Sequence, residues 1–198
     1  VFEKRKVGVL LPVFSLPSKY GIGTFGKEAY NFIDKLKAGK HSYWQVLPHG
    51  PTGFGDSPYM AYSTFAGNSY FIDLDMLVED GYLTEEDCSS VSWGDDPTHV
   101  NYDAVSKGRK TLLKLAYTNG KKIFKTKAYK TFAEDNAHWL DDYALYMALR
   151  DENNGPWTQW KEAEKLREEA AMEEARERLS EEIGYYCFVQ FLFFRQWA

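Results

Sequence analysis

Three stretches near the start of the chain have a clear spacing of hydrophobic and polar positions. Residues 7–14, VGVLLPVF, form a continuous apolar run, which is typical of a strand buried on both faces. In KEAYNFIDKLKAG, residues 27–39, apolar side chains fall at i, i+3, i+4 and i+7, which predicts an amphipathic helix ended by Gly39. Residues 42–48, SYWQVLP, predict a second strand. Together they predict a βαβ unit with parallel strands.

From Thr84 onward the pattern is that of helices separated by polar turns. Thr84 followed by Asp87 is typical of a capping box at the start of a short helix. Apolar stripes then predict one helix over residues 102–116 and another over residues 140–148, which the turn residues ENNGP end. The sequence shows no further convincing strand in this part.

The end of the chain changes from highly charged to strongly apolar. Charged residues of both signs crowd residues 161–182, which is typical of a solvated helix face. A helical stripe then continues from Leu179 to Phe194, with further apolar residues around it. A helix that is apolar on most sides needs neighbours on most sides. Two strands and a few short helices are too little to cover it, so we expect the chain to be incomplete at Ala198.

Composition and charge narrow the class of protein. The chain has 198 residues, of which 44% are hydrophobic, and this composition predicts a globular protein. Its net charge is -5, so we expect no basic surface that would bind nucleic acid or an anionic membrane. Its apolar runs near the start are too short for a membrane span, and no signal peptide is visible. Cys88 and Cys187 give no disulfide framework, so we expect a cytoplasmic protein.

The loop after the second predicted strand is unusually rich in glycine and aromatic residues. Its sequence, GPTGFGDSPYMAYSTFAGNSYFIDLD, covers residues 50–75. Loops at the carboxyl ends of parallel strands hold the ligand sites of α/β folds, and aromatic rings beside polar groups suit sugars. Aromatic side chains in turns also fill the edges of cores. Composition alone leaves both interpretations open.

Several sequence motifs resemble those of one enzyme family. SLPSKYGIG, YWQVLP, GPTGFGDSPY and FAGNSYFIDLD are similar, in order and spacing, to the amino-terminal region of 4-alpha-glucanotransferases, known as amylomaltase or disproportionating enzyme. Later, WLDDYALYMALR, PWTQW and FVQFLFFRQWA look like the helical segment that follows in that family. The resemblance covers nearly the whole chain and is strongest over residues 7–75.

The resemblance implies an α/β fold, the amino-terminal part of a (β/α)8 barrel. Residues 1–75 would hold the first two strands, the crossover helix and the substrate-binding loop, and residues 76–198 a mainly helical inserted subdomain. It implies an α-1,4-glucan or maltooligosaccharide substrate and a retaining mechanism, in which an Asp nucleophile forms a glycosyl-enzyme and a Glu acts as acid and then base. It implies no metal and no organic cofactor.

The same resemblance places the catalytic carboxylates of the family on later strands, so no catalytic residue is expected in this chain. We therefore expect an amino-terminal portion of a 4-alpha-glucanotransferase. The alternative is a non-catalytic fragment that binds α-glucan or has a structural role.

Five residues are candidates for substrate binding. By resemblance, Tyr59 stacks on a sugar near the cleavage subsite, with the Ser57 hydroxyl beside it. Asp56 either holds a sugar hydroxyl or caps its own turn, and the turn role is favoured. Phe54 stands where the family commonly has a tyrosine at an accessory glucan contact. Tyr102 is either another accessory aromatic residue or part of the core.

Two departures from the family pattern concern the same loop. His49 stands where the family usually has an apolar residue, and we interpret it as a local substitution, not a catalytic base. Met60 replaces a glutamine that is common after the motif, which removes a polar contact. The other histidines lack the spacing of a metal site.

Overall fold

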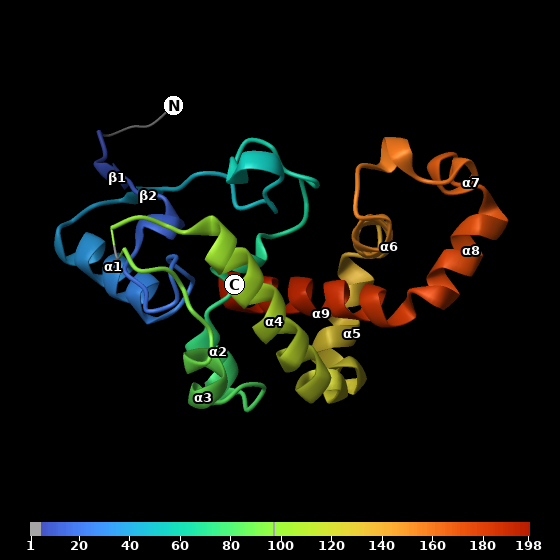
Figure 1. Cartoon of the computed structure of the whole chain (residues 1–198). Coiled ribbons are helices and arrows are strands. Elements are labelled where there is room, and N and C mark those ends of the chain that lie inside the picture. Colours follow the sequence, from blue (N-terminus) through green and yellow to red (C-terminus); the bar gives the residue numbers. More distant parts are fainter. Residues whose placement is uncertain (1–4, 97) are drawn as a thin grey trace. The chain divides into compact units, whose positions relative to one another are not determined.

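The computed structural model describes residues 5–96 and 98–198, apart from the side chain of Phe54. This part of the chain is mostly helical, with a short parallel sheet of two strands (Figure 1). The strands are β1 (Gly8–Leu10) and β2 (Tyr43–Gln45). The α-helices are α1 (Lys27–Ala38), α2 (Leu74–Glu79), α3 (Glu85–Ser89), α4 (Tyr102–Gly120), α5 (Lys127–Asp135), α6 (Leu140–Asn153), α7 (Glu162–Lys165), α8 (Glu169–Arg178) and α9 (Ser180–Trp197). Short 3-10 helices are η1 (Val13–Ser15), η2 (Phe54–Asp56), η3 (Ser69–Phe71), η4 (Lys121–Lys125) and η5 (Trp157–Gln159).

The two predicted strands pair in parallel, with Val9 opposite Trp44, but they are shorter than predicted. The first ends before Pro12, and the chain then turns into η1 instead of continuing as a strand to residue 14. The prediction that this strand is buried on both faces is also wrong for this chain, because the Leu10 side chain is 57% exposed. The physical reason is that β1 pairs with only one strand in the described residues.

The predicted crossover helix is confirmed as α1, and Gly39 ends it by donating its N–H to the Lys35 carbonyl. Its apolar stripe is only partly covered. Phe32 packs edge-on against Trp44, with ring centroids 5.0 Å apart, whereas Ile33 is exposed. The βαβ unit is therefore present with part of its apolar surface open.

The described chain forms two compact units. Of the described residues, unit 1 comprises those up to Gly120 together with Leu192–Ala198, and unit 2 comprises Lys121–Phe191. The expected division after residue 75 stays a prediction about the functional parts of the protein, since the compact units divide the chain elsewhere.

In unit 1, the last residues of the chain pack against the segment that follows the aromatic loop. The Gln196 side chain accepts from the backbone N–H of Asp73 at 2.6 Å and donates to the Asp73 carbonyl at 3.2 Å. A Cβ atom on Gly67 would lie 2.1 Å from the Phe193 ring, so only glycine fits there. Phe25 packs edge-on against the same ring, at 5.3 Å between centroids. These contacts make the carboxyl-terminal residues part of the core of unit 1.

The other helices predicted for unit 1 are present. Thr84 and Asp87 form the predicted reciprocal capping box of α3. The apolar stripe of α4 is buried, and Arg109 within it is buried as well. The Arg109 guanidinium donates to the Ile72 carbonyl and lies over the Trp93 ring, and burial lowers its pKa to about 10.

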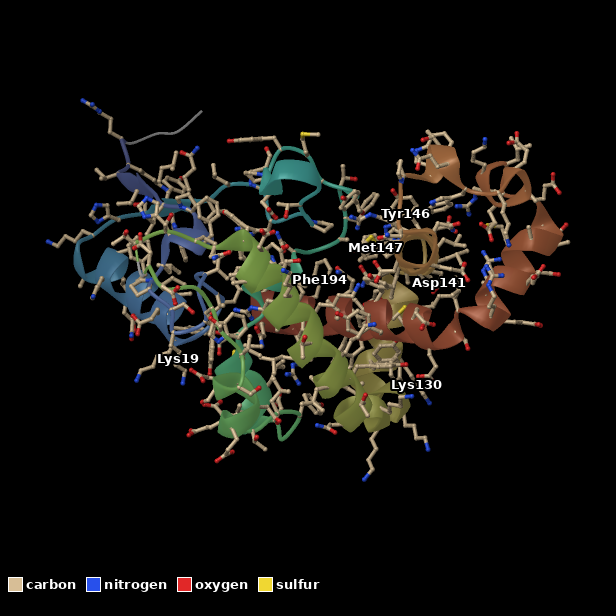
Figure 2. The ribbon with its side chains drawn as sticks, viewed as in Figure 1. Lys19, Lys130, Asp141, Tyr146, Met147 and Phe194 are labelled. Carbon is tan, nitrogen blue, oxygen red and sulfur yellow. The ribbon has the colours of Figure 1, made fainter. Side chains whose placement is uncertain are left out.

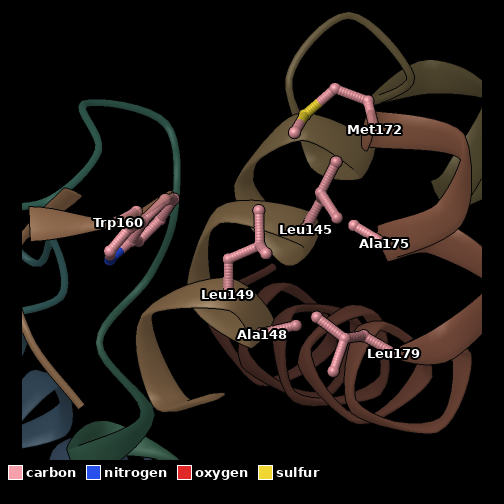
Figure 3. Packing of buried hydrophobic residues seen from close by; sticks show 7 residues of the cluster. All are labelled: Leu145, Ala148, Leu149, Trp160, Met172, Ala175 and Leu179. Atoms are coloured by element: carbon pink, nitrogen blue, oxygen red, sulfur yellow. The ribbon is translucent and has the colours of Figure 1, made fainter. Parts of the chain in front are cut away.

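Unit 2 has a buried apolar core between α6 and α8, which Figure 3 shows from close by. The cluster consists of Leu145, Ala148, Leu149, Trp160, Met172, Ala175 and Leu179. The stripe predicted for residues 140–148 is confirmed in α6. The charged segment of residues 161–182 does not form one helix, because Arg167 adopts a left-handed backbone (φ 56°) between α7 and α8.

The expectation that the chain cannot cover its apolar carboxyl-terminal helix is wrong. In unit 2, Phe191 packs edge-on against Tyr129 and Phe132, with ring centroids 5.5 Å apart in both pairs. Phe188, one turn earlier, is fully buried, and its ring centroid lies 6.5 Å from that of Phe124.

Among the described helices, including α9, none has the length and apolar character that crossing a membrane requires.

Candidate functional site

The aromatic loop after β2 folds back on itself in unit 1. Thr52 and Ala61 form an isolated antiparallel bridge, and the Gly53 N–H donates to the Met60 carbonyl at 2.9 Å. The tip between them is η2, where Gly55 has φ 75° and Asp56 has φ 51°. Two successive left-handed residues turn the chain sharply, and glycine is the residue that adopts this conformation without strain. The DSPY motif therefore stands on a tight, internally bonded turn.

Asp56 makes its contacts within unit 1. Its carboxylate accepts a hydrogen bond from the Thr52 hydroxyl at 3.3 Å, which agrees with a turn-stabilising role. Its negative charge also acts on two tyrosines. Burial, and then the charge of Asp56, raise the pKa of Tyr102, and burial is also the main cause of the raised pKa of Tyr70. A role of Asp56 in substrate binding stays a prediction.

Asp56 and Tyr102, which are 46 positions apart in the sequence, line one small cavity of about 10 Å³. The loop supplies Asp56, and the first residue of α4 supplies Tyr102. Tyr70 lines the same cavity, and its ring centroid lies 6.5 Å from that of Tyr102. The cavity is large enough for about one water molecule. Tyr102 is half-buried, so part of its side chain packs against neighbours and part is accessible to solvent.

Tyr102 also lines a larger cavity of about 650 Å³ in unit 1. Its walls come from the segment after β1 and from the segment before α4: Phe14, Ser15, Leu16, Pro17, Ser18, Gly21, Ile22, Asp96, Thr98, His99 and Val100. This volume is in the range of ligand sites, and the role of Tyr102 as an accessory aromatic residue stays a prediction.

Ser57 caps the end of η2, and Tyr59 follows two residues later. The Ser57 hydroxyl accepts from the backbone N–H of Tyr59 at 3.3 Å. The Tyr59 side chain is 73% exposed, and the neighbouring Met60 is exposed too. Neither Ser57 nor Tyr59 lines the small cavity with Asp56. The side chain of Phe54 lies outside the described residues, so its expected glucan contact stays a prediction.

His49 packs among aromatic rings in unit 1, edge-on to Phe25, Phe71 and Trp197 at 4.9 to 5.5 Å between centroids. Burial lowers its pKa, so the imidazole is neutral at pH 7. Its packing agrees with the interpretation of a local substitution. Among the described residues, no three or more His, Cys, Asp and Glu side chains gather closely enough to hold a metal ion.

Sequence reasoning missed three polar residues around the small cavity: Thr52, Asn68 and Tyr70. A local signal was available for Asn68, whose side chain caps η3 by accepting from the Tyr70 N–H at 3.0 Å. Thr52 carries no comparable signal, because its contact with Asp56 depends on the sharp turn between them.

Comparison with known proteins gives a consistent result over nearly the whole chain. A family profile described as 4-alpha-glucanotransferase matches residues 11–198. The chain is 43% identical over 197 residues to the 4-alpha-glucanotransferase of Streptococcus pneumoniae. It is 44% identical over 198 residues to the 4-alpha-glucanotransferase of Thermus thermophilus. Each of these alignments covers 98% of this chain and 39% of the relative, so the chain spans about 39% of their length.

A solved structure agrees with the sequence matches. The chain is similar to the amylomaltase from Streptococcus agalactiae in complex with acarbose, with a TM-score of 0.92 and 38% identity. The match covers 98% of this chain and 40% of that chain. The fold described above is therefore that of the corresponding part of an amylomaltase.

Proposed function

Since the chain belongs to the 4-alpha-glucanotransferase family, we propose that the complete protein transfers α-1,4-glucan segments between maltooligosaccharides. The observation that carries this proposal is the family match over residues 11–198, together with 43% identity to a relative of that name. The glycine-rich loop after β2, with its exposed tyrosine, supports a sugar as the substrate.

The proposed mechanism is a double displacement with retention at the anomeric carbon. An Asp carboxylate attacks C1 of the donor sugar while a Glu gives its proton to the departing O4, so the C1–O4 bond breaks and a glycosyl-enzyme forms. The same Glu then takes the proton from the 4-hydroxyl of a second glucan, which attacks C1 and releases the Asp. We assign neither carboxylate to this chain.

The contribution of this chain is to hold the donor. Tyr59 offers a ring face beside the Ser57 hydroxyl, on a turn whose backbone hydrogen bonds fix its shape. Asp56 and Tyr102 supply polar atoms at a neighbouring cavity. A ring held on a preorganised loop costs little conformational entropy when a sugar stacks on it.

We further propose that β1, α1 and β2 are the start of a (β/α)8 barrel. The parallel pairing and the exposed apolar side chain of Leu10 support this, since inner strands of barrels are covered on both faces. The unbridged, buried Cys88 and Cys187 support a reducing compartment such as the cytoplasm.

Disproportionation of maltotriose tests the proposed function. The complete protein should release glucose and form longer maltooligosaccharides, because each transfer shortens one chain and extends another. Residues 1–198 alone should release no glucose above a buffer blank. A complete protein that binds maltotriose without releasing glucose would contradict the proposal and favour a non-catalytic glucan-binding role.

A further inference from the structure

Unit 2 contains a cavity that the proposed transfer reaction does not use. It has a volume of about 250 Å³ and lies beside the α6–α8 core. Its walls are Leu145, Tyr146, Leu149, Trp157, Trp160, Glu164, Lys165, Arg167 and Met172. Tyr146 projects from α6 (Figure 2), and its ring lies 5.5 Å from that of Trp160. The cavity is thus lined by three aromatic rings and three charged side chains.

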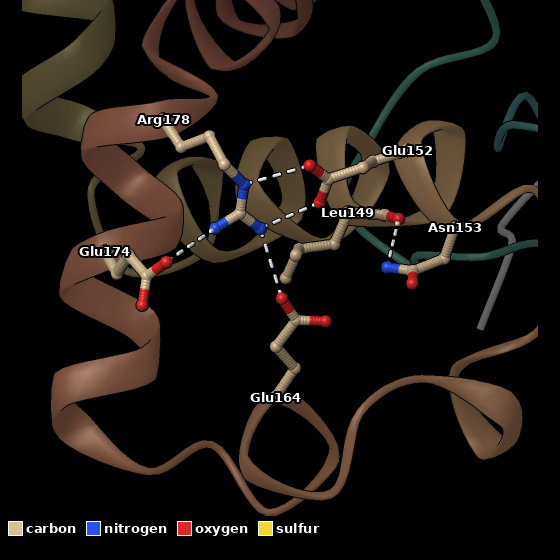
Figure 4. Close-up of polar contacts among 6 residues, drawn as sticks. All are labelled: Leu149, Glu152, Asn153, Glu164, Glu174 and Arg178. Carbon is tan, nitrogen blue, oxygen red and sulfur yellow. Dashed lines mark hydrogen bonds and ion pairs between the residues drawn. The ribbon is translucent and has the colours of Figure 1, made fainter.

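One of the charged groups at this cavity is buried and incompletely paired. Glu164 is 6% exposed, and its Oε1 accepts from Arg178 at 3.1 Å. Its other oxygen, Oε2, is buried without a hydrogen-bond partner in the described structure. Figure 4 shows Oε1 directed at Arg178 and the second oxygen directed away from it. Leaving a buried carboxylate oxygen without a donor costs free energy, so a bound molecule that donates a hydrogen bond to this oxygen would be stabilised.

The competition for Arg178 explains why this oxygen lacks a partner. Two nitrogens of the guanidinium donate to both oxygens of Glu152, at 2.9 and 2.8 Å. The remaining terminal nitrogen lies 3.7 Å from Glu174. Three carboxylates therefore share one guanidinium, and Arg178 has no donor left for the second oxygen of Glu164.

The charges around the cavity define the class of molecule that fits. Lys165 pairs with Glu162 at 2.8 Å, and Arg167 pairs with Asp142 at 2.7 Å. With Glu164, the three charged residues of the lining sum to one positive charge. An organic cation would meet Lys165 and Arg167, and an anion would meet the free oxygen of Glu164. A neutral molecule that both donates and accepts hydrogen bonds avoids both conflicts.

The rings add a requirement for flat apolar faces. Trp160 is buried, whereas Trp157 is 52% exposed, so a ligand can reach one ring from the solvent and rest against the other. The volume is below the 300 Å³ or more that is usual for larger ligands, which indicates a single ring. A pyranose combines hydroxyl donors and acceptors with C–H faces that stack on aromatic rings.

We propose that this cavity binds one pyranose unit of a glucan, at a site in unit 2 that is separate from the loop of Tyr59. A sugar hydroxyl donates to Oε2 of Glu164, and the ring packs against Trp157. The choice of a glucan as ligand rests on the proposed function. The site itself rests on the cavity, the unpaired carboxylate oxygen and the exposed tryptophan.

Fluorine NMR of the complete protein labelled with 5-fluorotryptophan tests the site. The signals of Trp157 and Trp160 are assigned with Trp157→Phe and Trp160→Phe, and maltose is the probe. We expect both signals to shift saturably with maltose and not with butylammonium or acetate. Shifts with butylammonium alone would overturn the proposal, and so would the absence of any response, as when another segment of the protein fills the cavity.

Two matched variants test the role of the carboxylate. Glu164→Gln should raise the maltose dissociation constant at this site by about tenfold, because it weakens a charge-assisted hydrogen bond. Glu174→Gln removes another carboxylate from Arg178 but does not line the cavity, so the constant should stay within about twofold. Equal effects of the two variants, with unchanged thermal unfolding, would overturn the proposal.

Two further variants separate stacking and the proposed function. Trp157→Ala, followed on the Trp160 signal, should weaken maltose binding about three- to tenfold. Tyr59→Ala should slow transfer in the complete protein but leave the maltose titration of Trp157 unchanged. Loss of that titration in Tyr59→Ala would overturn the separate site. A protein that shows the titration without any transfer would refute the proposed function alone.

Discussion

The βαβ segment of unit 1 and the α6–α8 pair of unit 2 differ in how far they bury similar apolar residues. In the first, Leu10 is 57% exposed and Ile33 is also exposed, although both belong to regular elements. In the second, Leu145 is 2% exposed and Ala148 and Ala175 are fully buried. A pair of helices can close a core between two faces, whereas two strands and one helix leave the rest of a sheet face uncovered. The apolar pattern alone did not reveal this difference.

Removing one leucine from each region should produce the largest contrast. Leu145→Ala should lower the free energy of unfolding by about 2–5 kcal/mol, because it removes most of a buried side chain from the core. Leu10→Ala in the 198-residue chain should cost about 0.5 kcal/mol or less, since that side chain is mostly in water. Urea denaturation of both variants measures these values.

The same pair of variants in the complete protein sharpens the contrast. If β1 is a barrel strand, the cost of Leu10→Ala should rise toward that of Leu145→Ala, because neighbouring strands would cover it. An equally small cost in the complete protein would contradict the barrel proposal.

Tyr59 should show the next largest effect, on transfer and not on stability. Tyr59→Ala should raise the barrier to glucan transfer in the complete protein by about 1–3 kcal/mol, from the loss of an aromatic stacking surface. Since the side chain is 73% exposed, thermal unfolding should change little. Tyr59→Phe, which keeps the ring, serves as the matched control for the stacking.

Kinetics with maltotriose and calorimetry on both Tyr59 variants decide the question. A normal rate per folded molecule together with a large fall in melting temperature would show that Tyr59 has a packing role.

Unit 2 should respond to acid through Glu152. Its hydrogen bond from Arg178 holds the pKa of the Glu152 carboxyl below its usual value. Because the folded-state pKa is depressed, the pair stabilises the protein above the unfolded glutamate pKa of about 4.3, and this contribution is lost as pH falls through the folded-state pKa. Both side chains are about one-third exposed, so the effect is small.

Urea denaturation at several pH values compares the parent protein with Glu152→Gln. The parent should be more stable at pH 7, and the difference should vanish toward pH 2. A difference that persists unchanged at low pH would exclude Glu152 as the titrating group.

The sequence predicted the elements that depend on local chemistry. The capping box of Thr84 and Asp87 and the end of α1 at Gly39 involve residues a few positions apart, so their signals are complete within a short window. The lengths of the strands were not predictable in the same way, because pairing depends on which neighbours a strand finds. The break at Arg167 was hidden too, since the charged pattern is the same on both sides of it.

The same distinction between local signals and long-range packing applies to the candidate site. The resemblance pointed to Tyr59, Ser57 and Asp56 as neighbours in one motif, and in the structure Asp56 ends η2, Ser57 caps it and Tyr59 follows. The approach of Asp56 to Tyr70 and Tyr102 depends on the packing of α4, which no short window contains. The cavity of unit 2 combines Tyr146 on α6 with Trp157 and Glu164 on later turns, and its key feature is an oxygen that lacks a partner. Only atomic geometry can reveal such an absence.

The contact between Gln196 and Asp73 can form only late in the synthesis of this chain. Gln196 follows Asp73 by 123 positions, and Phe193 fills the space over Gly67, so unit 1 lacks these contacts until the last residues of this chain have been made. At a translation rate of about 5–20 residues per second, that wait is roughly 6 to 25 seconds. During this interval the segment just after the aromatic loop lacks the cover of Phe193 and the hydrogen bonds of Gln196.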